Sequence, residues 1–169
     1  QGGHTCAIFT NGKVSCWGRN TKGQLGVGDK TDRNDQGTQI DLGSPAIDCA
    51  VGYSFTCFIV ETGALYCWGT NYNDQLGYDN GGTDVTSPGD AWDLGDNTAI
   101  GVSAGEDHTC ILLDDHSVKC YGRRSLGALG DGSDVGKGES HLMIDAVQII
   151  SYGFTTCAVL TNGKMKCWG

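Results

Sequence analysis

The stretch HTCAIFTNGKVSCWG, residues 4–18, decides how the rest of this chain is interpreted. Two cysteines, Cys6 and Cys16, flank an Asn-Gly pair, which favours a tight turn between two β-strands. Pairing Cys6 with Cys16 leaves a three-residue loop that ends at Gly12. Such loops favour a left-handed last residue, and glycine adopts that conformation without steric cost. The stretch therefore predicts a β-hairpin.

The same stretch returns three times along the chain. Its copies read FTCFIVETGALYCWG, HTCILLDDHSVKCYG and TTCAVLTNGKMKCWG, at residues 55–69, 108–122 and 155–169. The first cysteines of successive copies are 51, 53 and 47 residues apart, and a period near 50 residues indicates an array of repeats. A Leu-Gly turn, an acidic variable loop and a short apolar segment follow each of the first three hairpins. Short strands with glycine turns in such an array predict the blades of a β-propeller.

The repeats divide the chain into three units and the opening hairpin of a fourth. Their boundaries are 1–51, 52–104, 105–152 and 153–169. We therefore predict an all-β fold in which residues 1–169 form a partial β-propeller of about 3.5 blades. Open sheet edges expose unpaired backbone groups, so we expect the remaining blades to come from a longer chain or from a second chain.

The shared register places the two cysteines of each hairpin directly opposite each other. Opposed Cα atoms of an antiparallel pair lie about 4.5–5.5 Å apart, which is within disulfide range. The neighbouring positions on the same face are apolar in all four hairpins, so we expect this face to be buried in each, including Val159 and Met165 in the fourth. We predict four disulfides: Cys6–Cys16, Cys57–Cys67, Cys110–Cys120 and Cys157–Cys167. Cys49 is left unpaired, and a small apolar core position is expected there, with an intermolecular bridge or a reactive thiol as the alternative.

The cysteines and histidines do not form a pattern that is typical of catalysis or metal binding. Zinc sites favour C-x₂₋₄-C and redox sites C-x-x-C, whereas each pair here is separated by nine residues across a hairpin. His4 and His108 share a position that Phe55 and Thr155 fill in the other copies, which indicates packing. Hydrolase, phosphate-loop and dinucleotide motifs are absent from the sequence. We therefore expect no catalytic, metal-binding or cofactor-binding residue, and no enzymatic activity.

Acidic residues gather in the variable loops. They are Asp29, Asp32 and Asp35 after the first hairpin, and Asp131 and Asp134 after the third. Aspartate next to glycine and serine is typical of solvated turns, which is the interpretation we favour. Calcium binding is the alternative, although the spacing does not fit an EF-hand loop.

Charge and cysteine content restrict the class of partner and the compartment. The chain of 169 residues has 20 acidic and 11 basic side chains, giving a net charge of −9. Such a chain repels nucleic-acid phosphates and anionic membranes, so we expect neither as a partner. The sequence has no apolar run of about 18 residues and thus no expected membrane span. Four cysteine pairs favour an oxidising compartment, extracellular or at the cell surface.

The repeat resembles that of the regulator of chromosome condensation family, whose pattern contains G-x-V-x-x-W-G-x-N-x-x-G-Q-L-G. The second unit has Asp74 in place of a glycine, and the third has Tyr121, Arg124 and Ala128 in place of Trp, Asn and Gln. The resemblance implies a propeller, typically of seven blades. The residues of the first unit that match the pattern are Gly2, His4, Thr5, Ala7, Gly12, Val14, Trp17, Gly18, Asn20, Gly23, Gln24, Leu25 and Gly26.

Function transfers weakly from a fold that serves many activities. The founding member of the family is a nuclear guanine-nucleotide exchange factor, whereas the disulfide-bearing relatives resemble secreted or surface interaction proteins. We expect a non-enzymatic extracellular module for protein interaction or structural assembly, such as part of a surface filament or flagellar-hair-like fibre. Its partners would be proteins or further copies of itself. The alternatives are a guanine-nucleotide exchange factor for a small GTPase and a secreted hydrolase inhibitor.

Overall fold

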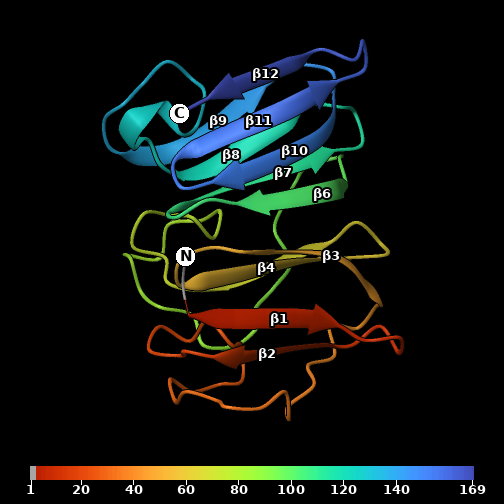
Figure 1. Cartoon of the computed structure of the whole chain (residues 1–169), viewed down its shortest axis with the longest axis vertical. Coiled ribbons are helices and arrows are strands. Elements are labelled where there is room, and N and C mark those ends of the chain that lie inside the picture. The colour runs from red at the N-terminus through yellow and green to blue at the C-terminus, as the bar shows by residue number, and fades with distance from the viewer. Residues whose placement is uncertain (1–2) are drawn as a thin grey trace.

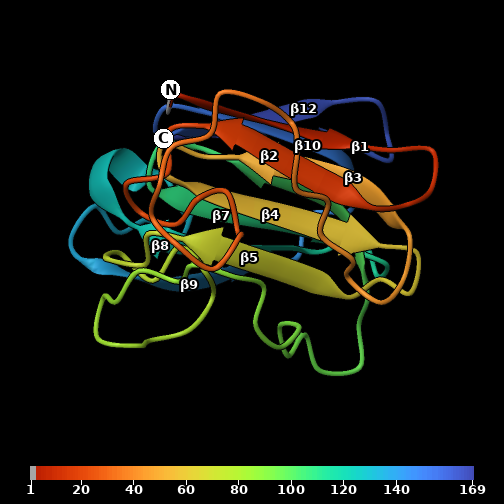
Figure 2. The ribbon, with the colours of Figure 1, turned by 90° about the horizontal axis from the view of Figure 1, so that it is seen from below.

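The computed structural model describes residues 3–169, which form four antiparallel sheets stacked along the long axis of the molecule (Figure 1). We call these sheets blades 1 to 4 in chain order. Seen from the end of blade 1, the sheets lie nearly over one another (Figure 2). A short 3₁₀-helix, η1 (Ser125–Gly127), follows the third hairpin. The strands are β1 (His4–Ile8) and β2 (Val14–Gly18) in blade 1; β3 (Ala46–Val51), β4 (Phe55–Val60) and β5 (Leu65–Gly69) in blade 2; β6 (Ala99–Ala104), β7 (His108–Leu113), β8 (Val118–Arg123) and β9 (Lys137–Leu142) in blade 3; and β10 (Ala146–Tyr152), β11 (Thr155–Leu160) and β12 (Met165–Trp168) in blade 4.

The all-β architecture of stacked propeller blades confirms the predicted fold class. Blades 2, 3 and 4 each combine the apolar segment that ends one sequence unit with the hairpin that begins the next. The strand β3 pairs with β4, β6 pairs with β7, and β10 pairs with β11. A sequence unit is therefore offset by one strand from a structural blade, and this offset ties successive units into one continuous array.

The hairpin register agrees with the prediction in all four copies. Cys6 lies opposite Cys16, and the other three cysteine pairs are opposed in the same way. The turns also agree, because Gly12 has a φ of +77° and His116, in the same position of the third hairpin, has a φ of +66°. The structure contains four disulfides across these hairpins, with Cα–Cα separations of 4.0–4.1 Å. Cys49 carries a free, half-buried thiol whose pKa is raised by burial.

The two faces of each hairpin have different compositions, and their contacts form the core. We call the face with the disulfide the cysteine face, and the opposite face, with Trp17, Trp68, Tyr121 or Trp168, the tryptophan face. In every internal interface, the cysteine face of one blade packs on the tryptophan face of the next. Three clusters show this: Val14 and Cys16 with Phe58 and Trp68; Leu65 and Cys67 with Ile111 and Tyr121; and Val118 and Cys120 with Ala158 and Trp168.

The fourth hairpin corrects the expectation that every cysteine face is buried. Met165 is 69 % exposed and Cys167 is also exposed, whereas the equivalent Val14, Leu65 and Val118 are fully buried. The difference arises because, within residues 3–169, no blade follows β12 to cover this face. Burial in this fold therefore depends on the neighbouring blade, which the pattern within one hairpin does not reveal.

The Leu-Gly turn closes each internal interface. Leu25 and Leu129 are fully buried there, as is Leu76 in the second unit. The indole of Trp68 donates a hydrogen bond of 3.0 Å to the backbone oxygen of Gln24, immediately before Leu25. Gly26 has a φ of +74°, and a Cβ atom there would lie 2.5 Å from the Trp68 indole. The turn therefore requires glycine for both its conformation and its close approach to the next blade.

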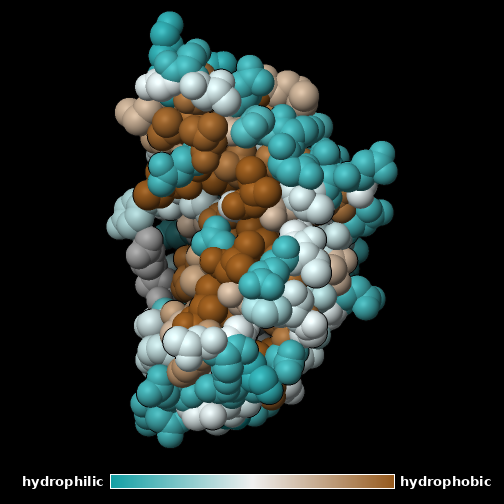
Figure 3. Space-filling view, turned by 90° about the vertical axis from the view of Figure 1, so that its right-hand side faces the viewer, coloured by the Kyte–Doolittle hydropathy of each residue, from teal (hydrophilic) through white to brown (hydrophobic). Residues whose placement is uncertain are grey.

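The first strands of blades 2, 3 and 4, which are β3, β6 and β10, share a β-bulge at the same position. We call them the inner strands. The register shifts leave Ile47, Ile100 and Val147 as the extra residues of β3, β6 and β10. Bulges redirect a side chain relative to the regular pleat, and these three residues are 53 %, 48 % and 47 % exposed. A space-filling view shows an apolar band running along the stacked blades (Figure 3). The bulges thus place an apolar column along the inner edge of the array.

Candidate interaction groove

A cavity of about 910 Å³ lies where the inner strands end and the Leu-Gly loops begin. Its lining comes from blades 1 to 3, and combines the turns after β3 and β6 with the loops after β2, β5 and β8. We call this cavity the groove. The residues that line it are Lys22, Tyr53, Ser54, Thr70, Tyr72, Asn73, Gln75, Gly81, Gly82, Asp84, Asp107, Arg123, Ser125, Gly136 and Lys137.

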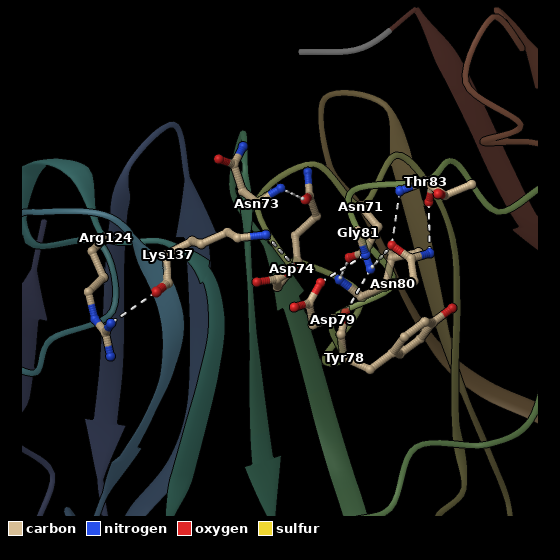
Figure 4. A network of polar contacts seen from close by, with 12 residues as sticks. Asn71, Asn73, Asp74, Tyr78, Asp79, Asn80, Gly81, Thr83, Arg124 and Lys137 are labelled. Carbon is tan, nitrogen blue, oxygen red and sulfur yellow. Dashed lines mark hydrogen bonds and ion pairs between the residues drawn. The ribbon is translucent and has the colours of Figure 1, made fainter.

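A buried asparagine, Asn71, shapes the loop that forms one wall of the groove (Figure 4). Its side-chain amide donates to the backbone oxygen of Tyr78 at 2.7 Å and to the side-chain oxygen of Asn80 at 3.0 Å. Its own oxygen accepts a hydrogen bond of 2.9 Å from the backbone N–H of Leu76. A buried amide with all three bonds formed fixes the backbone around it, so this loop has a defined shape.

The same role recurs in the other units with different residues. Asn20 accepts a hydrogen bond of 3.0 Å from Leu25 N–H and donates one of 2.9 Å to the Asp29 backbone oxygen. In the third unit the family position holds Arg124, whose guanidinium bonds the Asp131 carboxylate at 2.8 Å and the backbone oxygen of Lys137 at 3.0 Å. The departure from the family pattern is thus compensated by a longer side chain that also closes its loop.

Ion pairs join the loops of neighbouring blades across the groove. Lys137 of blade 3 reaches Asp74 of blade 2 at 2.8 Å (Figure 4), and this contact raises the pKa of the lysine. Lys22 and Lys30 share the carboxylate of Asp84, at 3.5 and 2.7 Å. Burial acts to raise the pKa of Asp84, but the two lysines outweigh burial and hold that pKa below its usual value. One shared carboxylate leaves a surplus positive charge at this end of the groove.

The opposite end of the groove is formed by Asp107 and Arg123. Their closest nitrogen and oxygen atoms are 3.6 Å apart, and the guanidinium carbon of Arg123 lies 5.7 Å from the ring centre of Phe154. Burial raises the pKa of the Asp107 carboxyl, and the positive charge of Arg123 opposes that shift. Arg123 is exposed, and an arginine that lies over an aromatic ring and beside a carboxylate is restrained, so its remaining donors are oriented for a partner.

Two tyrosines stand at the rim of the groove. Tyr72 is 75 % exposed and Tyr53 is 44 % exposed. The Tyr53 backbone N–H donates to the Glu106 backbone oxygen at 3.2 Å, which fixes the turn after β3 against blade 3. Tyrosine and arginine are the residues most often found at the energetic centres of protein interfaces. A rigid groove with exposed tyrosines and an oriented arginine is therefore suited to bind a polypeptide.

His4 and His108, the two histidines that share one sequence position, lie between blades and do not line the groove. The Nε2 atom of His4 lies 2.8 Å from the Thr56 hydroxyl of the next blade, and that of His108 lies 2.9 Å from Thr156. Burial lowers the pKa of each imidazole to about 4. The position is one of packing, as expected, but it also forms a polar bond between blades that the repeat comparison did not predict.

The acidic residues of the variable loops mostly bond to their own loops. Asp29 accepts from the Thr31 backbone and from Arg33, Asp32 accepts from the Asn20 backbone at 2.7 Å, and Asp35 accepts from the Gly37 backbone at 3.1 Å. Over residues 3–169, no group of three or more histidine, cysteine, aspartate or glutamate side chains is placed to hold a metal ion. These aspartates therefore act as turn formers in the structure.

Sequence reasoning missed the residues that build the groove. Tyr53 and Tyr72 stand in segments that differ between units, so comparison of the repeats gave them no role. Asn20 and Asn71 carried a signal, since both occupy the same place two residues after Trp-Gly. Buried asparagine after a strand is a typical loop organiser, and that reasoning would have found them.

The fold defines a disulfide-bearing β-propeller module, and its loops line a groove. Family models for the regulator of chromosome condensation (RCC1) repeat match residues 2–24, 47–75 and 99–127, and a related model matches residues 62–112. The chain belongs to the RCC1 repeat family. This result confirms the resemblance inferred from the repeated motif.

Individual relatives resemble this chain over only part of their own length. The ultraviolet-B receptor UVR8 of Arabidopsis thaliana is 31 % identical over 98 % of this chain and 39 % of the receptor. The probable E3 ubiquitin-protein ligase HERC4 of human is 33 % identical over 77 % of this chain and 12 % of the ligase. The chain thus spans about two fifths of the first relative and a smaller part of the second.

Solved structures agree on the fold. Human WBSCR16 superposes with a TM-score of 0.85 at 19 % identity, over 99 % of this chain and 45 % of that protein. Prp20p of Saccharomyces cerevisiae, a protein studied for its binding to Gsp1p and histones, superposes with a TM-score of 0.84 at 20 % identity, over 99 % of this chain and 42 % of Prp20p. The chain therefore has the curvature of a propeller segment.

Proposed function

We propose that this chain is a non-enzymatic, extracellular propeller module that binds a protein partner in the groove. The observation that carries the proposal is the groove itself, in which Tyr53, Tyr72 and Arg123 stand exposed. Asn71 and the Lys137–Asp74 pair hold the loop that carries Tyr72, a backbone bond to Glu106 holds Tyr53, and the Phe154 ring lies beneath Arg123. Large side chains on a fixed scaffold bind with a small loss of conformational entropy. Their grouping favours recognition of a polypeptide surface over a small molecule.

The compartment is supported by the disulfides. Four disulfides in a chain of this length are characteristic of proteins that fold in an oxidising environment. No helix in the described part of the chain is both long and apolar enough to cross a membrane. We propose that the module acts outside the cell or at its surface, where the disulfides persist.

The experiment is cross-linking from the groove followed by measurement of affinity. A photoreactive residue in place of Tyr72 captures the partner from the extracellular fraction of the source cells, and the purified partner is then titrated by calorimetry. We expect Tyr72→Ala and Arg123→Ala each to weaken binding at least tenfold, about 1.4 kcal/mol, as for hot-spot residues. Tyr152→Ala, a 69 % exposed tyrosine that does not line the groove, is the matched control and should bind normally.

A guanine-nucleotide exchange activity is the second candidate, because the chain shares its fold with Prp20p, which binds Gsp1p. Nucleotide release from small GTPases tests it directly. Release stimulated by the chain, and lost in Arg123→Ala, would replace the extracellular proposal.

Wild-type binding of the captured partner by both Tyr72→Ala and Arg123→Ala would show that the groove is not the interaction site.

A further inference from the structure

The ion pairs at the groove share one feature, which is that the cation is the more exposed partner. Their cationic side chains are 39–50 % exposed, whereas their carboxylates are 11–25 % exposed. Because the anion of each pair is the more buried partner, the surface that a ligand meets there is mostly cationic. Among residues 3–169 these pairs are Lys22–Asp84, Lys30–Asp84, Arg123–Asp107 and Lys137–Asp74, and each includes a residue that lines the groove.

The ion pairs away from the groove do not show this pattern. In two of them the carboxylate is the more exposed partner, at 64 % against 42 % and at 44 % against 30 %, and in the third the exposed fractions are 22 % and 25 %. The whole chain has a net charge of −9, so exposed cations at the groove run against its composition. In the described part of the chain, these other pairs are Lys13–Asp41, Arg33–Asp29 and Arg124–Asp131.

A buried amide adds a hydrogen-bond donor to the groove. Gln75 lines the groove and is buried, and its side-chain oxygen accepts a hydrogen bond of 2.8 Å from the Asn73 backbone N–H. Its Nε2 atom has no hydrogen-bond partner among residues 3–169. A buried donor without an acceptor is stabilised when an oxygen atom bonds to it. Gln24 has the same unpartnered amide but does not line the groove, so the cations define the site and the amide adds to it.

We propose that the groove binds an acidic, extended segment of the partner protein, with its carboxylates next to Lys22, Arg123 and Lys137. This inference rests on the proposed function, in which the groove binds a polypeptide, and it specifies the chemistry of that polypeptide. Carboxylates accept charge-assisted hydrogen bonds from lysine and arginine, and their second oxygen can accept from an amide such as that of Gln75. Tyr72 at the rim packs against the apolar parts of the segment.

The charge of the rest of the chain selects a short acidic segment over a long polyanion. A sulfated polysaccharide would extend from the groove over other surfaces of a chain with a net charge of −9, which repel it. Repulsion between exposed charges is screened beyond about 8 Å at physiological ionic strength, so a segment confined to the groove avoids most of it. Aromatic side chains at the rim likewise favour a polypeptide.

The first test uses a labelled peptide of alternating glutamate and alanine, with a glutamine–alanine and a lysine–alanine peptide of equal length as controls. Binding to the whole chain is measured by fluorescence anisotropy at low and at physiological ionic strength. We expect the glutamate peptide to bind about tenfold more tightly than the glutamine peptide and to weaken as salt is added, and the lysine peptide not to bind. Failure of the glutamate peptide to bind more tightly than the glutamine peptide would overturn the inference, as would tighter binding of a sulfated oligosaccharide.

Neutral variants locate the binding in the groove. Lys22→Gln and Lys137→Gln should each weaken binding of the glutamate peptide about two- to fivefold. Lys13→Gln is the matched control, because Lys13 is similarly exposed but does not line the groove, and its affinity should stay at the wild-type value. The inference fails if Lys22→Gln and Lys137→Gln keep the wild-type affinity, or if Lys13→Gln weakens binding as much as they do.

A variant that strengthens binding guards against effects of misfolding. The Asp79 charge faces Lys137 and, after the hydrogen bond from Asp74, contributes to the raised pKa of that lysine (Figure 4). Asp79→Asn removes this competing charge and keeps a side-chain oxygen for the hydrogen bond from the Gly81 N–H. We expect it to tighten binding of the glutamate peptide about twofold, and an unchanged or weaker affinity would contradict the inference.

Peptide binding and partner binding are measured separately, which keeps this inference distinguishable from the proposed function. If the captured partner loses affinity in Tyr72→Ala while the glutamate and glutamine peptides bind equally, the groove is the interaction site and the acidic segment is wrong. If the glutamate peptide behaves as expected while the partner binds Tyr72→Ala and Arg123→Ala normally, the acidic ligand is right and the proposed partner site is wrong.

Discussion

Replacing His108 by phenylalanine should remove about half of the acid sensitivity that the two interblade histidines give this protein. His108 is fully buried, and its Nε2 atom lies 2.9 Å from the Thr156 hydroxyl of blade 4. Its Nδ1 atom is buried without a hydrogen-bond partner among the described residues. Protonation would therefore place an uncompensated charge between blades 3 and 4, and burial lowers the pKa of the imidazole from 6.5 to about 4.

The size and sign of the effect follow from the two pKa values. The unfolded chain binds a proton near pH 6.5 and the folded chain only near pH 4, so the contribution of His108 is fully present above pH 6.5 and is lost as the pH falls towards 4. At pH 5 the loss is about 2 kcal/mol for one histidine. His4 occupies the equivalent position, and burial lowers its pKa to about 4 against an opposing backbone hydrogen bond at Phe55, which makes the loss from the two histidines about 4 kcal/mol.

The assay is urea unfolding at pH 7 and pH 5, without reductant and at one protein concentration. Phenylalanine is the right replacement, because Phe55 fills this position in blade 2 and is fully buried there. Thr156 keeps a second contact, 3.0 Å to the hydroxyl of Ser151, so its hydroxyl is not left without a partner. We expect His108→Phe to lose about 2 kcal/mol less than wild type between pH 7 and pH 5.

The matched control is Tyr152→Phe, a change at an exposed aromatic residue that leaves both interblade histidines in place and should keep the wild-type loss of stability between pH 7 and pH 5. Lowered aspartate pKa values do not interfere, since those carboxyls stay ionised throughout this pH range in both states. The reasoning is refuted if His108→Phe shows the wild-type loss of stability between pH 7 and pH 5.

Three further predictions test the packing. Asn71→Ala removes the three hydrogen bonds of a buried side chain and should speed amide exchange between residues 76 and 83, with a loss of about 1–3 kcal/mol, whereas exchange in the 20–33 loop should not change. Gly26→Ala forces a Cβ against the Trp68 indole at positive φ and should lower stability by about 2 kcal/mol or more in thermal unfolding; Gly28→Ala, with open space around it, should cost less. Limited reduction of the chain, followed by alkylation and mass spectrometry, should open Cys157–Cys167 before the buried Cys57–Cys67, and the reverse order would contradict the burial pattern.

The hairpins could be predicted from the sequence because their information is local and repeated four times. A turn residue such as Gly12 and an opposed pair such as Cys6 and Cys16 are ten or fewer residues apart, so periodicity alone fixes their register. The four copies predict the same register independently of one another. The positive φ of His116 shows that the turn keeps its backbone conformation in the copy where glycine is replaced. Local geometry was therefore readable without knowledge of the neighbouring blade.

Contacts between blades were harder to predict, because they join residues about 50 positions apart. The bond from His4 to Thr56 depends on how one sheet is stacked on the next. The exposure of Met165 likewise depends on the blade that would follow it, and its own sequence is as apolar as that of the buried copies. Alternation within a strand indicates that a face is apolar, whereas the next element decides whether that face is covered.

Arg124 shows why comparison of the repeats did not predict the groove. The loop of the third unit is closed by a different residue, since a guanidinium bonded to Asp131 and to the backbone of Lys137 takes the place of a buried asparagine. The blades are constrained on both faces by packing, and their positions recur. The loops are constrained only at their closing bonds, so the side chains between those bonds, such as Tyr72, are free to differ from unit to unit. The groove proposed to bind a partner is therefore built where the repeat is least repetitive.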